Sequence, residues 1–223
     1  MTDTIIVSGG DIHSDFALDF LKKNIDQAGR KNIKLIAADR GVEFFKGTDW
    51  QPEVAVGDFD SLSAEGELYL QGLVETEIVR LKPEKDDSDT QSAVNFAIDH
   101  GAERITILGA TGKRIDHLMA NFGLLVHGRN RGADIILVDQ WNYMKLIESH
   151  TVLKKEEQFG KYVSFFSLEG DMPGLTLVGF KYPLDHYHLR VSDSGLTVSN
   201  EIKAEEAVVS FDGKYLLMLM TRD

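Results

Sequence analysis

Five short apolar runs, each followed within a few residues by glycine or aspartate, constrain the fold of this chain most. They are rich in Ile and Val and lie at Ile5–Val7, Ile33–Ala37, Val54–Val56, Ile105–Leu108 and Ile135–Val138. Apolar residues at consecutive positions are typical of parallel strands that are covered on both faces. The first two-thirds of the chain therefore predict a mostly parallel sheet.

Helical patterns lie between these runs. The segment Phe16–Ile25 has apolar residues spaced for one helical face. Ser88 and Gln91 form a capping-box pattern ahead of a buried stripe, and Asp116 is a plausible N-cap for a helix over 117–126. Strands that alternate with helices indicate right-handed crossovers, and so a Rossmann-like layered α/β fold.

After about residue 150 the pattern changes to short strand candidates joined by turn residues. Without a long helical pattern between them, these strands favour an antiparallel β-sandwich. Asp212-Gly213 is expected to join the last two strands as a hairpin. We therefore predict an α/β domain over residues 1–149 and an all-β domain over residues 150–223. The strand candidates of the second domain are Tyr162–Leu168, Leu175–Phe180, Tyr187–Val191, Leu196–Ser199, Ala207–Phe211 and Tyr215–Met220.

Composition argues against several classes of partner and chemistry for this chain. Its net charge of −12 argues against nucleic-acid and anionic membrane surfaces, which are bound by clusters of Lys and Arg. The sequence has no cysteine, which excludes disulfides and thiolate chemistry. The start MTDTIIVSGG lacks the pattern of a signal peptide, and no apolar run approaches the ~20 residues of a membrane span. A cytoplasmic location is expected.

Acids gather at the predicted carboxyl ends of the strands, where ligands bind in such sheets. Asp58 and Asp60 follow one strand with a single residue between them. Two like charges so close together cost free energy unless a cation or a proton lies between them. Either the pair makes turn hydrogen bonds, or it forms an all-oxygen Mg²⁺ site with Asp39 and Asp89 at the same edge.

A glycine-rich segment, Gly109–His117, follows another strand and opens a helix, so that its backbone amides are placed to bind phosphate. It is not a Walker A loop, because Ile107 and Arg114 stand where that motif needs glycine and Ser or Thr. Arg114 suits bidentate contacts with phosphate. His117 is interpreted as a partner of the helix terminus rather than a catalyst.

Taken together, these motifs resemble the thiamine pyrophosphokinase family. They occur in the order of that family and cover both predicted domains. Arg40 departs from the pattern, since the family usually has glycine after the first aspartate. The matching stretches are AADRG (37–41), GDFDS (57–61), KDDSDT (85–90), GATGKRIDHLMAN (109–121) and VSNE (198–201).

The resemblance implies a reaction and a site. Pyrophosphate would pass from ATP to the hydroxyl of thiamine, giving thiamine diphosphate and AMP. It also implies a homodimer, with thiamine held between the acidic edge of one subunit and the β-sandwich of the other. The implied catalytic residues are Asp58, Asp60, Asp89 and Arg114, and the three aspartates would hold Mg²⁺. The implied substrate-binding residues are Asp39, Lys85, Thr111, Asp116, His117, Ser199 and Asn200.

Two other functions remain open from the sequence. One is another Mg²⁺-dependent D-x-D enzyme, such as a nucleotide-sugar transferase or a phosphatase. Phosphatases of that type often have Thr two residues beyond the second aspartate, where this chain has Leu62. The other is a nucleotide-binding module without activity, which would bind its ligand without turnover.

Overall fold

The computed structural model describes residues 3–82, 84, 86–193 and 195–223. The chain forms two compact units, Met1–Gln140 (unit 1) and Trp141–Asp223 (unit 2). The two units therefore divide after residue 140, whereas the sequence predicted a domain boundary after residue 149. That domain boundary stays a prediction. None of the helices in the described ranges is long and apolar enough to cross a membrane.

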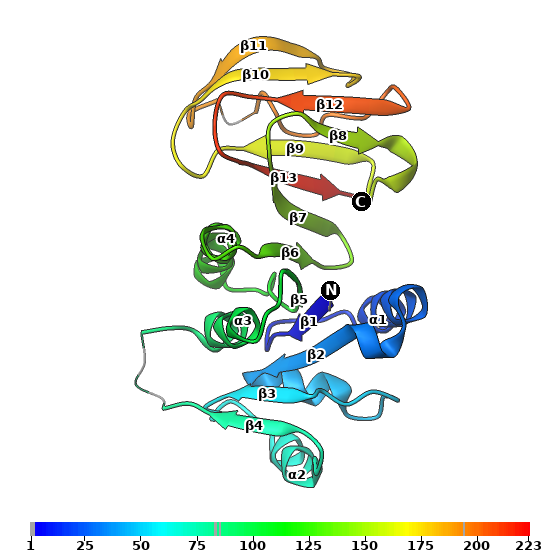
Figure 1. The fold of residues 1–223 in the computed structure, drawn as a ribbon, viewed down its shortest axis with the longest axis vertical. Coiled ribbons are helices and arrows are strands. Elements are labelled where there is room, and N and C mark those ends of the chain that lie inside the picture. Colours follow the sequence, from blue (N-terminus) through cyan, green and yellow to red (C-terminus); the bar gives the residue numbers. More distant parts are fainter. Residues whose placement is uncertain (1–2, 83, 85, 194) are drawn as a thin grey trace. The chain divides into compact units, whose positions relative to one another are not determined.

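Unit 1 contains a parallel sheet with the strand order β4-β3-β2-β1-β5-β6 (Figure 1). Its strands pair in parallel throughout, as the apolar runs predict. The strands are β1 (Asp3–Val7), β2 (Ile33–Ala38), β3 (Val54–Gly57), β4 (Glu77–Arg80), β5 (Arg104–Leu108) and β6 (Asp134–Val138). The order changes direction between β1 and β5, which makes their carboxyl ends the topological switch point of the sheet.

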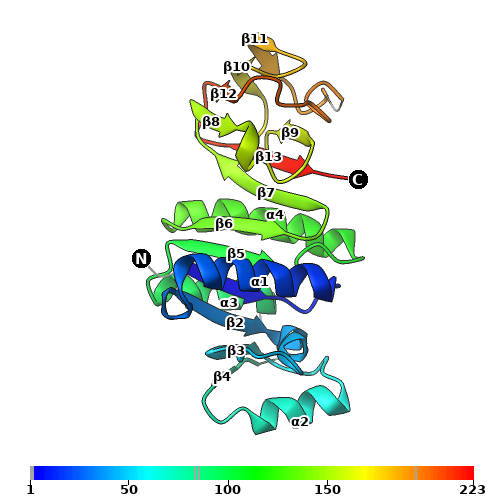
Figure 2. The same cartoon turned by 90° about the vertical axis from the view of Figure 1, so that its right-hand side faces the viewer.

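Helices cover both faces of this sheet. Helix α1 lies on one face, and α3 and α4 lie together on the other (Figures 1 and 2). Double cover explains why β1, β2 and β3 are almost continuously buried. The α-helices are α1 (Ser14–Ala28), α2 (Ala64–Gly72), α3 (Asp89–Asp99) and α4 (Ile115–Asn130), and the 3₁₀ helices are η1 (Arg30–Asn32), η2 (Asp39–Phe45) and η3 (Lys155–Glu157).

Two helix starts test the capping predictions. Ser88 is the N-cap of α3, and its hydroxyl accepts the N–H of Gln91 at 3.2 Å, which confirms the capping box position. The prediction for α4 was wrong, because Arg114 is the N-cap and Asp116 lies in the first turn. Asp116 forms an ion pair with Arg114 from this first turn.

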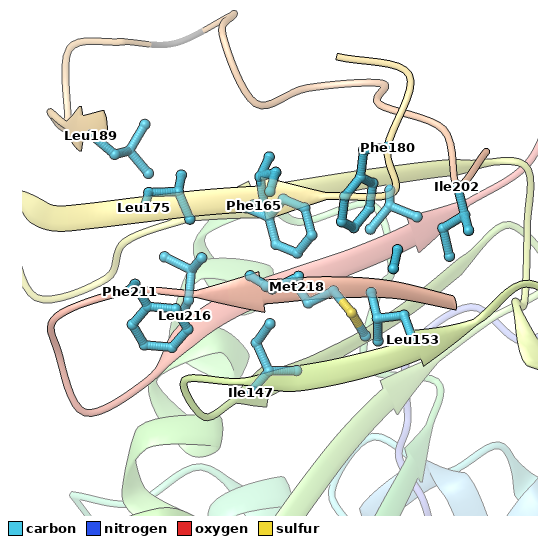
Figure 3. Close-up of a cluster of buried hydrophobic side chains, with 14 of the residues drawn as sticks. Ile147, Leu153, Phe165, Leu175, Phe180, Leu189, Ile202, Phe211, Leu216 and Met218 are labelled. Carbon is cyan, nitrogen blue, oxygen red and sulfur yellow. The ribbon is translucent and has the colours of Figure 1, made fainter. Parts of the chain in front are cut away.

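Unit 2 is an antiparallel β-sandwich, as predicted. One sheet has the order β7-β13-β9 and the other β11-β10-β12-β8. Side chains from both sheets form one buried cluster, which includes Phe165 and Met218 from one sheet and Leu175 from the other (Figure 3). The strands are β7 (Asn142–Ile147), β8 (Thr151–Lys154), β9 (Tyr162–Phe166), β10 (Met172–Val178), β11 (Leu184–Leu189), β12 (Glu206–Ser210) and β13 (Leu216–Thr221).

Two predictions for unit 2 were wrong. Asp212-Gly213 does not close a hairpin, because β12 pairs with β10 and β8 whereas β13 pairs with β7 and β9. This turn carries the chain from one sheet to the other. The predicted strand Leu196–Ser199 is a turn, in which the side-chain hydroxyl of Thr197 donates to the carbonyl of Phe165 at 2.5 Å.

Candidate active site

A cavity of about 510 Å³ opens at the carboxyl ends of β1, β2 and β5, at the switch point of the unit 1 sheet. Its walls come from the loops that follow these strands and from the first turns of α3 and α4. The lining residues that matter below are Ser8, Asp39, Asp89, Thr90, Arg114, Asp116, His117 and Asn121. Segments that are far apart in the sequence thus meet where the glycine and aspartate pattern predicted.

Three of the predicted acids form a cluster beside this cavity. Asp39, Asp58 and Asp60 each offer a carboxylate oxygen, and these oxygens lie within 4.8 Å of one another. Asp39 follows β2 and Asp58 follows β3, so neighbouring parallel strands place them together. Gly57 allows the close approach, since a Cβ there would lie 2.9 Å from Asp39 Cα.

The backbone of the cluster is held in unusual conformations. Asp39 has φ 48° and Phe59 has φ 61°, both in the left-handed region that residues other than glycine seldom adopt. Phe59 is 6% exposed, and the guanidinium of Arg80 lies 5.4 Å from its ring centroid. The N–H of Asp60 donates to Asp58 Oδ1 at 3.2 Å. The turn hydrogen bond, one of the two alternatives that the sequence left open, is therefore present, and the same turn forms part of the acidic cluster.

The electrostatics of the cluster favour a cation. The negative charge of Asp58 raises the pKa of Asp60, with smaller contributions from burial, from Asp39 and from Asp89. Asp39 Oδ2 accepts the hydroxyl of Ser61, whereas the buried Asp39 Oδ1 receives no hydrogen bond from the described residues. A carboxylate oxygen in that position fits a ligand to a hard cation, and the donor set is all oxygen, as Mg²⁺ prefers.

Asp89, the third predicted Mg²⁺ ligand, is not one of the three clustered acids. It is the first residue of α3 and lines the cavity, and its charge is among those that raise the pKa of Asp60. The next residue, Thr90, shares a hydrogen bond of 2.5 Å with the hydroxyl of Ser8. The first turn of α3 is thereby joined to the loop after β1.

Arg114, Asp116 and His117 line the other side of the cavity, at the start of α4. Arg114 donates to both carboxylate oxygens of Asp116, with Nε 3.1 Å from Oδ1. This pairing is the main cause that lowers the pKa of Asp116 to about 2, and it raises the pKa of Arg114. Both side chains are well exposed, so phosphate can compete with Asp116 for the guanidinium.

The other predicted substrate-binding residues are not among the described residues that line the cavity. Thr111 does not line the cavity, and Lys85 lies outside the described residues. Ser199 is exposed in unit 2 with φ 57°, which is again left-handed. Asn200 is only 2% exposed, and its amide is held by backbone groups of Tyr182 and Glu201.

Sequence reasoning missed two polar residues that shape the site. Asn121 is 8% exposed and donates from Nδ2 to the carbonyl of Ala110 at 2.8 Å, which fixes the glycine-rich segment against α4. It lies four residues after His117, on the same helical face, and that spacing was the available signal. Ser61 was part of a quoted motif, but its hydrogen bond to Asp39 depends on the tertiary fold.

A parallel sheet whose switch point combines glycine-rich loops, an arginine and an acidic cluster defines a class of enzyme. Such sites transfer phosphoryl groups from a nucleotide, because they supply positioning and charge stabilisation. The family models narrow the class. Residues 25–137 match "Thiamin pyrophosphokinase, catalytic domain" and residues 149–216 match "Thiamin pyrophosphokinase, vitamin B1 binding domain". The chain belongs to the thiamin pyrophosphokinase family, and it is an enzyme of that activity.

Individual relatives agree with the family models. The chain is 30% identical to the thiamine pyrophosphokinase of Bacillus subtilis over 188 residues, which cover 84% of this chain and 87% of that protein. A crystal structure of thiamine pyrophosphokinase from Bacillus subtilis superposes with a TM-score of 0.85 at 27% identity, with 100% of both chains covered. A thiamin pyrophosphokinase family protein from Enterococcus faecalis gives a TM-score of 0.79 at 30% identity, again with 100% of both chains covered.

Proposed function

We propose that ATP binds in the unit 1 cavity with its phosphates between the acidic cluster and Arg114. One observation carries this proposal: Asp39 and Arg114 line a single cavity at the switch point of the sheet, and the carboxylates of Asp58 and Asp60 cluster with that of Asp39 beside it. Cations stabilise the negative charge of phosphates, and the acids beside the cavity would repel phosphate without a divalent ion between them. The reaction is then pyrophosphate transfer from ATP to the thiamine hydroxyl.

We propose that Asp39, Asp58 and Asp60 hold Mg²⁺. This set differs from the sequence-based one, in which Asp89 took the place of Asp39. The clustered oxygens and the buried Oδ1 of Asp39 support the change. When bound, Mg²⁺ neutralises phosphate charge and helps to orient the polyphosphate.

The chain's own residues then provide the remaining chemistry. Arg114 turns from Asp116 to the phosphates, and the backbone amides at the start of α4 face the same anions. In the transfer, the thiamine hydroxyl oxygen bonds to the β-phosphorus, and the bond from that phosphorus to the oxygen of the α-phosphate breaks. AMP leaves with this oxygen. A carboxylate of the site accepts the hydroxyl proton.

Unit 2 is proposed to bind thiamine, because residues 149–216 match the vitamin B1 binding domain. Within it, Ser199 presents an exposed side chain on a left-handed backbone. Asn200 is proposed to support the thiamine site indirectly, by holding the backbone of Tyr182, since its side-chain amide is already hydrogen-bonded there. The homodimer, with thiamine between subunits, and the cytoplasmic location stay predictions.

The function is tested by incubating the purified chain with ATP, Mg²⁺ and thiamine, and separating the products by chromatography. Equal amounts of AMP and thiamine diphosphate are expected, and only with both substrates present. ADP would instead indicate transfer of a single phosphoryl group, and no consumption of nucleotide would indicate a binding module. Release of inorganic phosphate from simple esters would indicate a phosphatase.

The metal assignment is tested with Asp58→Asn, which keeps the size of the side chain but removes its charge. Turnover should fall by at least about 100-fold, because the cluster loses a charged ligand. The matched control is Asp26→Asn, which removes the same charge from an exposed position on α1. Near-normal turnover by Asp58→Asn would refute the role of this cluster.

A further inference from the structure

The carboxylate of Asp87 joins the segment just before α3 to the side of that helix. Its Oδ1 accepts Gln91 Nε2 at 2.6 Å, and its Oδ2 accepts Asn95 Nδ2 at 3.1 Å. Gln91 and Asn95 lie four and eight residues further on, along one face of α3. Both oxygens of Asp87 are thus used by amide donors of this helix.

Asn95 extends this connection from α3 to α4. Its Oδ1 accepts His127 Nε2 at 2.7 Å and Arg131 Nη1 at 2.9 Å. These two donors fix the orientation of the amide, so that its NH₂ group must face Asp87. The amide therefore bridges a cationic donor at the end of α4 and an anionic acceptor before α3, and each charge strengthens the opposite hydrogen bond.

The far end of this network is also anchored. Arg131, the C-cap residue of α4, donates from Nη2 to Asp99 Oδ1 at 2.5 Å, at the end of α3. The helices α3 and α4 lie on the same face of the sheet and contact each other (Figure 1). The network of Asp87, Asn95, His127, Arg131 and Asp99, here the α3–α4 network, runs between them.

The first turn of α3 is the part of the site that this network reaches. Asp89 lies two residues after Asp87, and Thr90 is bonded to Ser8 on the side of β1. The helix does not need Asp87 as a cap, because Ser88 already accepts the N–H of Gln91. The two bonds of Asp87 therefore have a different consequence, which is to fix where the first turn begins.

We propose that Asp87 is a positioning residue, which acts through Asn95 to hold the first turn of α3 so that Asp89 faces the acidic cluster. This inference rests on the proposed Mg²⁺ and ATP site. The competing explanation is a general one, in which any negative charge before α3 stabilises its N-terminus. The two differ in a testable way, because Asn95→Ala leaves that charge in place and breaks only the network.

The variants are Asp87→Asn, Asn95→Ala and the double variant, with Asp26→Asn as the charge-matched control on α1. For each, kcat, the KM for thiamine and the Mg²⁺ concentration for half-maximal rate are measured. Each single variant should lower kcat about 10-fold and raise the required Mg²⁺ about 10-fold, because Asp89 adds negative charge beside the three proposed ligands and would no longer be held there. The KM for thiamine should stay unchanged, and the double variant should be no worse than the worse single one.

A second measurement does not depend on turnover. Mg²⁺ that binds only the folded protein raises its melting temperature. At the same Mg²⁺ concentration, Asp87→Asn and Asn95→Ala should show a smaller rise than the wild type and the control. Asp87→Glu serves as a further variant, since it keeps the charge but moves the carboxylate, and it should behave like Asp87→Asn.

The outcomes separate the two proposals. If the wild type shows no Mg²⁺-dependent rise and no turnover, the proposed site fails and the positioning role fails with it. If the wild type responds and Asp87→Asn responds equally, with unchanged kcat, only the positioning role is refuted. Full activity of Asn95→Ala and Asp87→Glu, with loss in Asp87→Asn alone, would favour the general charge effect and overturn the proposal.

Discussion

Replacing Asn200 by alanine separates a structural role from direct contact with thiamine. Asn200 is 2% exposed in unit 2, and all of its side-chain polar atoms are occupied. Its Oδ1 accepts the N–H of Tyr182 at 3.0 Å and the N–H of Glu201 at 2.9 Å, and its Nδ2 donates to the carbonyl of Tyr182 at 2.8 Å. Its backbone N–H and carbonyl both pair with Val163 of β9. The amide therefore joins the segment around residue 182 to the β9 edge.

The loss of stability can be estimated from these bonds. Asn200→Ala removes three hydrogen bonds and leaves three backbone groups without their partners. Tyr182 is 55% exposed, so water can reach part of this backbone and reduce the penalty. At about 1 kcal/mol for each bond, the free energy of unfolding should fall by about 3 kcal/mol. If the chain unfolds in one step, its melting temperature should fall by roughly 6–12 °C.

The assay is thermal unfolding followed by circular dichroism, together with the KM for thiamine at a temperature where the variant is folded. Ser199→Ala is the control for stability, because it truncates the exposed neighbouring side chain and should change the melting temperature by only about 2 °C or less. A melting temperature unchanged in Asn200→Ala, with a large rise in KM, would refute the structural role. It would mean that the amide turns from Tyr182 to the substrate.

Two further predictions concern the acidic cluster. Asp60→Asn should stabilise the metal-free protein increasingly as pH rises above about 4, because the raised pKa of Asp60 makes its ionisation unfavourable in the folded state. Melting temperatures of both proteins from about pH 4 to pH 7 test this, and Mg²⁺ should narrow their difference. A difference that does not vary with pH would contradict the repulsion from Asp58. Gly57→Ala should lower the free energy of unfolding by about 1–3 kcal/mol and reduce turnover, because its Cβ would lie 2.9 Å from Asp39 Cα. Urea unfolding measures this, with Gly72→Ala as the control, since a Cβ there would point into open space. Equal stabilities for the two alanine variants would contradict the close approach.

The buried strands of unit 1 were predictable because both of their faces are covered. All five apolar runs of the first domain are strands of the parallel sheet. The missed strand, Glu77–Arg80, lies at the edge of the sheet and has exposed ends, so its sequence lacks the apolar run. The missed helix, Ala64–Gly72, buries only Gly66 and Leu70 and shows no clear apolar stripe. Weak burial gives a weak sequence signal.

The pairing of strands in unit 2 was less predictable than their positions. The turn at Asp212-Gly213 has the composition of a tight hairpin, but it connects strands of different sheets. Strands β7 and β8 were missed as well, because they fall where the pattern changes from helical to extended. Local sequence specifies a turn, whereas the partner of each strand depends on contacts with distant segments.

The candidate site, too, was predictable only in part. That Asp39 and Asp58 would lie at the same edge of the sheet followed from their positions after parallel strands, and the pairing of β2 with β3 brings them together. The ion pair of Arg114 with Asp116 and the α3–α4 network depend on side-chain orientation, which spacing alone does not give. Asn200 shows the limit most clearly, since a residue matched to a binding motif has its amide turned into the fold.

The position of β13 has a consequence for how the protein is made. Strand β13 follows all other strands of unit 2 in the sequence, yet it lies between β7 and β9 and pairs with both. During synthesis, β7 and β9 are made before the strand that they share, so each keeps an edge without this partner until residues 216–221 emerge. The central strand of this sheet is thus the last to be made. Unit 2 is therefore the part of a nascent chain most in need of protection from aggregation.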